Sequence, residues 1–498
     1  MAYLSDKSSR LNVGSALLSQ MVSIFCGLIV PRTMIAAFGS EAYGATASIA
    51  QFLSYISLLE GGVSAVARAA LYRPLAENDS LKISGIYAAI RHFFLFVGSV
   101  FLFGNLLLAF GYHHIADISI FSPAESFLLV LIIGLSTMAQ YFFGISPMIL
   151  LHAHHRQYVG NLCSIAVTLL NTLMILSLTA AGQNLLAVKL LSSLIFLLRP
   201  LVFHLYVKRN YFLPPAGRED SALQQKWTGF GQHLAYFLHR NADIVLLTLL
   251  ADVKLVAVYS VYALVSNSIR NIVLAFSSGM EARFGKLLAE KDRKELLILY
   301  SNSQKLLSSV VVLFFGTAAV LILPFVKLYT QGFTDAPYLQ PAFALVLLLA
   351  EALNCLLLPC STLPIAANLF RNIRFGAYGE VALNLLLSCL FMQWNPLLGV
   401  ACGTLLSVIF RAVFYLSFTA RHILKTNLKK LLFPILQSTF LLIISAAAGC
   451  VFLWQKEINS FSRWILWAVP VFLSFAAIAA LLYRFGGEKD EENPDCQQ

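Results

Sequence analysis

Residues 125–151 read ESFLLVLIIGLSTMAQYFFGISPMILL and carry one charged side chain, Glu125, at their start. The hydrocarbon core of a bilayer is about 30 Å thick and a helix rises about 1.5 Å per residue, so about 20 apolar residues span it. A strand of a membrane barrel would alternate apolar and polar residues, whereas this run is apolar on every side. The stretch therefore predicts a transmembrane α-helix.

Comparable runs fill the rest of the chain. Of its 498 residues, 59% are hydrophobic and 12% are charged, whereas a soluble chain carries about 25% charged residues. Fourteen spans are predicted, at 11–38, 43–71, 84–110, 125–151, 159–181, 185–206, 229–251, 255–283, 299–329, 339–366, 373–393, 397–419, 431–454 and 463–483. The first run is too long for a signal peptide and is expected to stay in the membrane. We expect an all-α integral membrane protein.

The basic residues alternate from loop to loop. One set of loops, which includes both termini, holds roughly 23 Lys and Arg, and the opposite set holds three to five. Loops rich in Lys and Arg stay on the cytoplasmic side. The formal charge of +11 is thus spread over short loops that face anionic lipid, and does not indicate nucleic acid. We expect a multi-pass protein of the cell membrane with both termini in the cytoplasm.

Two loops of the chain match at a constant spacing. Leu75–Asp79 (LAEND) corresponds to Leu288–Asp292 (LAEKD), and Tyr87 to Tyr300, each 213 residues apart. Each match follows the second helix of a six-helix half, so the halves form a parallel repeat. The predicted organisation is an N-terminal six-helix lobe (1–210), a cytoplasmic linker (211–228), a C-terminal six-helix lobe (229–425), two additional transmembrane helices (426–484) and a cytoplasmic tail (485–498).

Short motifs add a family resemblance. They are Val30-Pro31-Arg32, Phe38–Gly44 (FGSEAYG), Leu59–Val63 (LEGGV), Arg240–Asp243 (RNAD) and Ala257–Ser260 (AVYS). Together they resemble the polysaccharide-type flippases, a family of the superfamily of multidrug, oligosaccharidyl-lipid and polysaccharide exporters (the MOP superfamily). The loop Asp252–Leu255 departs from the pattern because it lacks the Tyr-Gly of the first half.

The resemblance implies a function. Two six-helix lobes would enclose a central cavity that opens alternately to either side of the membrane. The substrate would be an undecaprenyl-pyrophosphate-linked oligosaccharide, flipped from the cytoplasmic to the outer leaflet for export of a cell-surface polysaccharide. Membrane lipids and polysaccharide assembly proteins would be the partners. A flippase for the peptidoglycan lipid precursor and an ion-coupled multidrug exporter are the alternatives on the same fold.

Charged residues inside the predicted spans are the candidates for function. A charge at the bilayer centre costs about 2.5–3.5 kcal/mol on insertion scales, so it normally faces a bundle interior or a watered cavity. The set comprises Arg32, Glu60, Arg199, Arg240, Asp243, Arg270, Glu351, Glu380 and Arg411. Arg199 precedes Pro200, where the helix is expected to break, and is assigned a structural role.

Four arginines are predicted to bind substrate: Arg32, Arg240, Arg270 and Arg411. The planar guanidinium donates paired hydrogen bonds and stays charged when desolvated, which suits a pyrophosphate. The alternative for each arginine is an internal salt bridge, or a side chain that reaches out to the lipid headgroups.

Three carboxylates are candidates for ion coupling: Glu60, Asp243 and Glu351. A buried carboxyl group can carry a proton near neutral pH, and with polar neighbours such as Asn241 it could hold sodium. Asp243 follows Arg240 by three residues, so the two share a helix face and could instead neutralise each other.

Motifs of enzymes are missing from the sequence. It contains no GxxxxGK[ST] loop, no HExxH and no nucleophile elbow, and seven of eight cysteines lie in apolar runs without a CxxC pair. His233 and His239 lie six residues apart, off one helix face, and are assigned no ligand role. A membrane-bound glycosyltransferase would need catalytic carboxylates, yet the longest outer loop, 111–124, carries only Asp117. We expect a non-enzyme with no catalytic residues, metal or cofactor.

Overall fold

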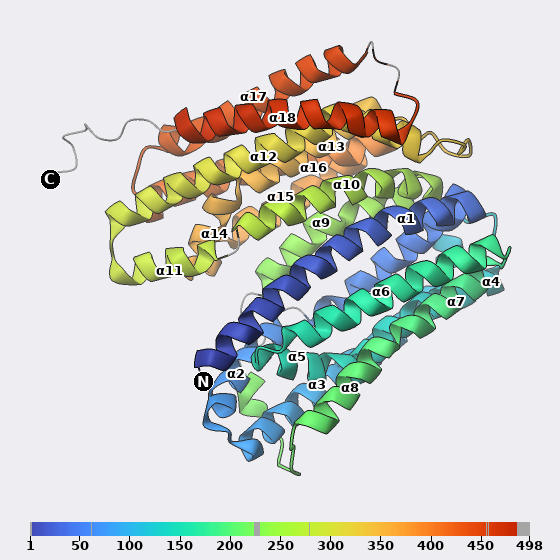
Figure 1. The fold of residues 1–498 in the computed structure, drawn as a ribbon, viewed down its shortest axis with the longest axis vertical. Helices are drawn as coiled ribbons and strands as arrows, with labels where there is room; N and C mark the ends of the chain where they lie inside the picture. Colours follow the sequence, from blue (N-terminus) through green and yellow to red (C-terminus); the bar gives the residue numbers. More distant parts are fainter. Residues whose placement is uncertain are drawn as a thin grey trace. The chain divides into compact units, whose positions relative to one another are not determined.

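The computed structural model describes residues 2–60, 62–223, 230–277, 279–454, 456 and 458–485, and within these ranges it contains helices and no strand (Figure 1). Gly61 of the predicted motif, residues 224–228 of the predicted linker and residues 486–498 of the predicted tail lie outside the described part. The helices that precede residue 224 are α1 (Ala2–Ile56), α2 (Val63–Glu77), α3 (Ser80–Ile115), α4 (Pro123–Ala139), α5 (Ile145–Ala153), α6 (Gln157–Ala180), α7 (Leu185–Phe196) and α8 (Leu198–Asn210).

The part of the chain after residue 229 forms ten α-helices among the described residues. They are α9 (Phe230–Leu250), α10 (Val253–Ser277), α11 (Met280–Glu290), α12 (Arg293–Tyr329), α13 (Pro341–Leu356), α14 (Leu358–Ala366), α15 (Phe370–Phe391), α16 (Pro396–Phe418), α17 (Leu428–Trp454) and α18 (Phe461–Phe485). Short turns of π-helix follow α4 and α16, at Gln140–Gly144 and Thr419–Ile423. As expected from Pro200, the helix breaks between α7 and α8.

Eleven of the described helical segments are long and apolar enough to cross a membrane. The first of them contains the first predicted span and the beginning of the second, because α1 kinks at Gly39, whose φ of 84° and ψ of 170° lie outside the helical region. Helices α9 and α10 supply two more predicted spans and carry polar residues within them. The predicted all-α membrane fold with about fourteen transmembrane helices is confirmed.

One predicted span is wrong as a continuous helix. The stretch 43–71 breaks after Ile56, forms a 3₁₀ turn at Ser57–Glu60, and resumes at Val63 as α2. Gly62 precedes α2 with φ of 80°, in the left-handed region that glycine enters without a steric cost. The apolar composition continues across the break, so hydrophobicity alone could not reveal it.

The backbone repeats at the spacing found in the sequence. Asn78 and Lys291 end α2 and α11 in left-handed conformations, with φ of 54° and 59°. The next residues, Asp79 and Asp292, accept hydrogen bonds from backbone N–H groups and so cap α3 and α12 at 3.1 and 2.9 Å. Each pair is 213 residues apart, which confirms the parallel repeat of the two six-helix halves.

The chain divides into two compact units. The first comprises residues 1–237 and 247–258, and the second comprises residues 238–246 and 259–498. The described part of the predicted linker packs on the first unit, because Leu223 is buried and the Glu219 N–H donates to Gly85 O at 3.2 Å. The five boundaries drawn from the sequence stay predictions.

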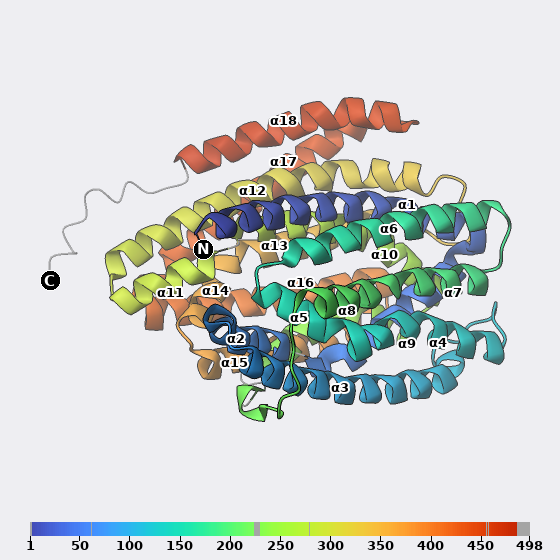
Figure 2. The same cartoon turned by 60° about the horizontal axis from the view of Figure 1, so that its bottom comes forward.

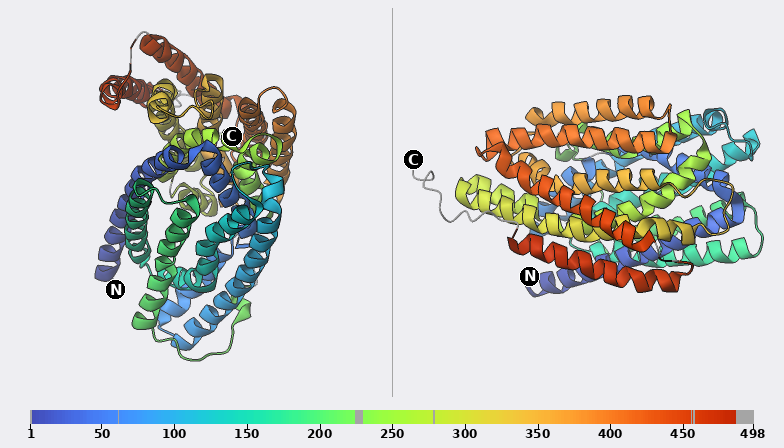
Figure 3. Two further views of the ribbon diagram at one scale, coloured as in Figure 1. Left: turned by 90° about the vertical axis from the view of Figure 1, so that its right-hand side faces the viewer. Right: turned by 90° about the horizontal axis from the view of Figure 1, so that it is seen from above.

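Within each unit the long helices run in nearly the same direction (Figure 3). In the first unit α1 packs against α6 and α3 against α4, and the buried Tyr112 hydroxyl donates to Ala45 O at 3.0 Å. In the second unit α12 is flanked by α13, α17 and α18 (Figures 1 and 2). The Trp464 indole N–H of α18 donates to Leu321 O of α12 at 3.2 Å. The two last helices are therefore anchored on α12.

Helices α15 and α16 approach through glycines four residues apart, Gly399 and Gly403. A Cβ at Gly403 would lie 2.6 and 2.9 Å from the backbone N and Cα of Ser388, and one at Gly399 would lie 2.6 Å from the backbone carbon of Phe391. Small residues at this spacing let two helices pack backbone to backbone in a membrane. The contact fixes the α15–α16 pair.

Gly403→Ala should therefore lower the free energy of unfolding of the second unit by about 1–3 kcal/mol, because the backbone of α15 cannot yield as a side chain could. Gly285→Ala is the matched control, since no atom lies within 4 Å of the added Cβ there. Thermal unfolding in detergent measures both variants. Equal midpoints for the two would show that α15 and α16 do not pack as described.

Candidate functional site

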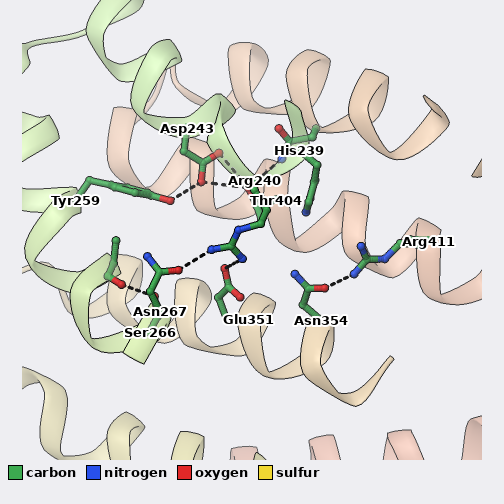
Figure 4. Close-up of polar contacts among 12 residues, drawn as sticks. His239, Arg240, Asp243, Tyr259, Ser266, Asn267, Glu351, Asn354, Thr404 and Arg411 are labelled. Atoms are coloured by element: carbon green, nitrogen blue, oxygen red, sulfur yellow. Dashed lines mark hydrogen bonds and ion pairs between the residues drawn. The ribbon is translucent and has the colours of Figure 1, made fainter. Parts of the chain in front are cut away.

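A buried carboxylate, Asp243 of α9, lies among hydroxyl groups of the second unit (Figure 4). The Tyr259 hydroxyl of α10 donates to it at 2.9 Å, and the Thr404 hydroxyl of α16 lies 3.2 and 3.4 Å from its two oxygens. The Asn384 amide of α15 in turn donates to Thr404 at 2.9 Å. Three helices thus supply a chain of neutral hydrogen-bonding groups that leads to the one carboxylate on α9.

Arg240 lies one turn before Asp243 and engages other partners. Its Nη2 donates to Asn267 Oδ1 of α10 at 2.6 Å, and its Nη1 lies 3.8 Å from Glu351 Oε1 of α13. The side chains of Arg240 and Glu351 are 18% and 15% exposed. The expected pairing of Arg240 with Asp243 is therefore replaced by an ion pair between α9 and α13.

A second ion pair lies deeper in the same unit. Arg411 Nη1 of α16 lies 3.1 Å from Glu380 Oε1 of α15, and His239 Nε2 of α9 lies 3.3 Å from the same oxygen. The Arg411 Nη2 also donates to Asn354 Oδ1 of α13. The side chains of His239 and Glu380 are 3% and 5% exposed, so this triad is enclosed by protein.

Several atoms of the network keep free hydrogen-bonding capacity. Among the described residues, no protein group hydrogen-bonds to His239 Nδ1, Glu351 Oε2, Asn384 Oδ1 or Arg411 Nε, although each atom is buried. Buried polar atoms are almost always satisfied by protein or by ordered water. These four atoms therefore keep unmet hydrogen-bonding capacity inside the network.

The structure brings together most of the residues predicted in the second half. Arg240, Asp243, Glu351 and Arg411 belong to this network (Figure 4). Arg270 lies on α10, and its part in substrate binding stays a prediction.

The two predicted residues of the first half lie in the first unit. Glu60 ends the 3₁₀ turn that follows α1, where it accepts hydrogen bonds from Ser64 at 3.0 Å and from Tyr141 at 3.4 Å. Arg32 is half-buried on α1, next to Pro31. Their roles in coupling and substrate binding stay predictions.

Sequence reasoning missed part of the network. His239 was assigned no role because it lies six residues after His233, off the same helix face. However, His239 lies four residues before Asp243, so one face of α9 carries both of these side chains. Glu380 and Arg411 were both identified as charges inside spans, and an opposite pair on neighbouring helices was the available signal. Asn267, Asn354, Asn384 and Thr404 gave no signal, because single amides and hydroxyls are common in transmembrane helices.

The network has no arrangement typical of a metal centre. Among the described residues, no group of three or more His, Cys, Asp or Glu side chains is placed to hold a metal ion. The network holds two arginines, Arg240 and Arg411, against carboxylates with which an anionic ligand would have to compete.

Similar proteins were sought at the level of sequence and of structure. No protein-family profile matches the chain, and no curated protein matches it. Among solved structures, the lipid II flippase MurJ in an inward closed conformation matches with a TM-score of 0.69 at 14% identity, covering 94% of this chain and 98% of that one. The chain shares the fold of that transporter.

Two multidrug transporters of the MATE family match as well. One, an inward-facing member of the MOP superfamily, has a TM-score of 0.58 at 11% identity and covers 81% of this chain and 95% of that one. The other, DinF-BH in complex with rhodamine 6G, has a TM-score of 0.57 at 13% identity and covers 83% and 95%. The predicted resemblance to the MOP superfamily is thus confirmed for the fold, and the chain is a multi-pass membrane protein.

Proposed function

We propose that this protein is a transporter that flips a polyprenyl-pyrophosphate-linked saccharide across the cell membrane. The observation that carries the proposal is the extent of the structural match. The lipid flippase aligns over 94% of this chain, whereas the two multidrug transporters align over 81% and 83%. The full fourteen-helix arrangement, and not only the twelve helices of the repeat, thus resembles a lipid flippase.

The proposed substrate is an undecaprenyl-pyrophosphate-linked oligosaccharide, moved from the cytoplasmic to the outer leaflet for export of a cell-surface polysaccharide. Both termini would lie in the cytoplasm, on the side of the basic loops. Alternating exposure of a cavity between two parallel six-helix repeats would carry the substrate. Polysaccharide assembly proteins would supply the oligosaccharide and receive it.

The second-unit network supports an exchange of anionic partners. In the network Arg240 is paired with Glu351 and Arg411 with Glu380. A pyrophosphate and a glutamate would compete for one guanidinium. A coupling cation that neutralised the Glu351 carboxylate would release Arg240 for the substrate. Binding of substrate and of the coupling ion would then be linked.

Two alternatives remain on the same fold. A peptidoglycan lipid precursor carries the same polyprenyl pyrophosphate, so the arginines would serve it equally, and the match to a lipid II flippase is equally compatible with it. An ion-coupled multidrug exporter would use Asp243, Glu351 and Glu380 to attract organic cations. The two lipid-linked ligands carry a pyrophosphate and a sugar, whereas an organic cation carries neither.

Ligand stabilisation of the purified protein separates the classes. A ligand at 100 times its Kd raises the free energy of unfolding by about 2.7 kcal/mol. We expect a water-soluble polyprenyl-pyrophosphate oligosaccharide to raise the unfolding temperature, and rhodamine 6G at equal concentration to leave it unchanged. A peptidoglycan lipid precursor, which carries a shorter sugar, tests the first alternative in the same unfolding assay. Stabilisation by rhodamine 6G alone would contradict the proposal.

A further inference from the structure

A small cavity is lined by residues of the first unit. Its volume is about 270 Å³, and it is lined by Ala50, Leu53, Ser54, Ser57, Leu58, Ile133, Thr137 and Phe237. All eight residues belong to the first unit. Pockets that take whole drug-sized molecules run from about 300 to 1,000 Å³. This cavity therefore suits a single ring and not an entire lipid headgroup.

The cavity forms where two helices are irregular. Ser57 and Leu58 belong to the 3₁₀ turn that interrupts the second span, and α4, which supplies Ile133 and Thr137, passes into π-helix at Gln140. Turns of π-helix are rare and are frequently found at functional sites. Regular helices in both places would present a different set of side chains to this space.

The polar groups of the lining are hydroxyls, and two of them donate their protons to backbone carbonyl groups. The Ser54 hydroxyl donates to Gln51 O at 2.6 Å and accepts from the Gln51 side-chain amide at 2.9 Å, which leaves it one lone pair. The Ser57 hydroxyl donates to Leu53 O at 3.2 Å. A hydroxyl that donates its proton keeps lone pairs that can accept. Ser54 and Ser57 therefore offer acceptors, which match a ligand that brings its own O–H or N–H donors.

The apolar part of the lining includes an aromatic ring. Phe237 lies edge to face with Tyr55, with ring centroids 5.2 Å apart and planes at 87°. This contact holds the Phe237 ring in place. Leu53, Leu58 and Ile133 complete the apolar walls. The cavity thus combines one fixed aromatic side chain with three hydroxyl-bearing residues.

The lining excludes other parts of the proposed substrate. None of its eight residues is charged, so neither a pyrophosphate nor an organic cation would find a counter-charge there. A polyprenyl chain would strip water from three hydroxyls without replacing their hydrogen bonds. A sugar ring has donors for the hydroxyls and apolar C–H groups for the aromatic ring.

We propose that this cavity is a subsite for one pyranose ring of the lipid-linked saccharide, and that Phe237 and Thr137 help to decide which saccharides are carried. The inference rests on the proposed function, since it names the part of that substrate which the first unit recognises. Phe237 of the subsite lies on α9, the helix that also carries His239 and Asp243 of the charged network.

Transport kinetics of paired variants in proteoliposomes test the subsite. Thr137→Val removes the hydroxyl at constant size, and Phe237→Leu removes the aromatic ring but keeps an apolar side chain. Each should raise the KM for the lipid-linked oligosaccharide roughly three- to tenfold with little change in kcat, because a hydrogen bond or an aromatic contact of ordinary strength is lost. Thr137→Ser and Phe237→Tyr are the matched controls and should stay near wild type.

A second substrate distinguishes the subsite from the function as a whole. Sugar-free polyprenyl pyrophosphate should be flipped by Thr137→Val and Phe237→Leu at the wild-type rate. Equal losses for both substrates would show a structural role and overturn the subsite, while the proposed function would stand. A wild-type protein that moves neither substrate would overturn the proposed function itself. Losses confined to rhodamine 6G transport would assign the cavity to organic cations and overturn the inference.

Discussion

Replacing Arg411 by methionine should lower the free energy of unfolding by about 3–5 kcal/mol, the loss typical when one partner of a buried ion pair is removed. The guanidinium lies 3.1 Å from Glu380 Oε1, and the two side chains are 10% and 5% exposed. Without it, the Glu380 carboxylate would keep only His239 as a nearby donor. Chemical or thermal unfolding in detergent measures the loss.

A double variant separates the lost charge from the lost packing. Arg411→Met with Glu380→Gln removes both charges and should recover much of the stability, since replacing both partners of a buried pair is often neutral. Arg73→Met is the exposed control, because its side chain is 87% exposed beside Glu77, and no loss is expected there. A double variant as unstable as the sum of the single variants would contradict the pairing of Arg411 with Glu380.

Asp243→Asn should abolish the dependence of transport on an ion gradient. The amide keeps the size of the carboxylate and can still accept from Tyr259 and Thr404, but it can neither take up a proton nor attract a cation. A difference of one pH unit across the membrane supplies about 1.36 kcal/mol for each proton transported. Coupled to transport, this energy changes the ratio of substrate between the two sides about tenfold. We expect wild type to respond to a pH or sodium gradient, and the variant to transport equally with and without one.

Proteoliposomes with either gradient imposed alone measure this response and identify the ion. Asp252→Asn, in the exposed turn between α9 and α10, is the matched control and should keep the coupling of the wild type. Unchanged gradient dependence in Asp243→Asn would remove Asp243 from the coupling step. In that event Glu60 and Glu351, the other candidates, would be tested by the same substitution to glutamine.

Much of the fold could be predicted because two strong physical signals run through the chain. Apolar runs of membrane length predicted the spans, and the LAEND and LAEKD loops predicted the repeat, which the caps at Asp79 and Asp292 reproduce. The break at Gly62 could not be predicted, because a glycine in an apolar run is also compatible with a continuous helix. Local backbone conformation there depends on packing, which no single-residue property encodes.

The charged residues of the site could be predicted from the sequence, but the residues with which they interact could not. The free-energy cost of placing a charge in the bilayer indicated that four residues face protein or water: Arg240, Asp243, Glu351 and Arg411. Which carboxylate meets which arginine depends on helix rotation and on contacts such as the α15–α16 glycine pair, and neither is visible in the sequence. Arg240 therefore pairs with Glu351 and not with Asp243, its neighbour on α9. The neutral residues Asn354 and Thr404 join the network for the same geometric reason.

Flipping of a fluorescent undecaprenyl-pyrophosphate oligosaccharide in proteoliposomes tests the proposed function most directly. A membrane-impermeant quencher reports the fraction of substrate in the outer leaflet, for wild type and for Arg32→Ala, Arg240→Ala, Arg270→Ala and Arg411→Ala. We predict that wild type equilibrates the lipid between leaflets, and that two or more of the variants that fold do not. Wild type that leaves the lipid in place but exports rhodamine 6G would contradict the proposal and assign the fold to a drug exporter.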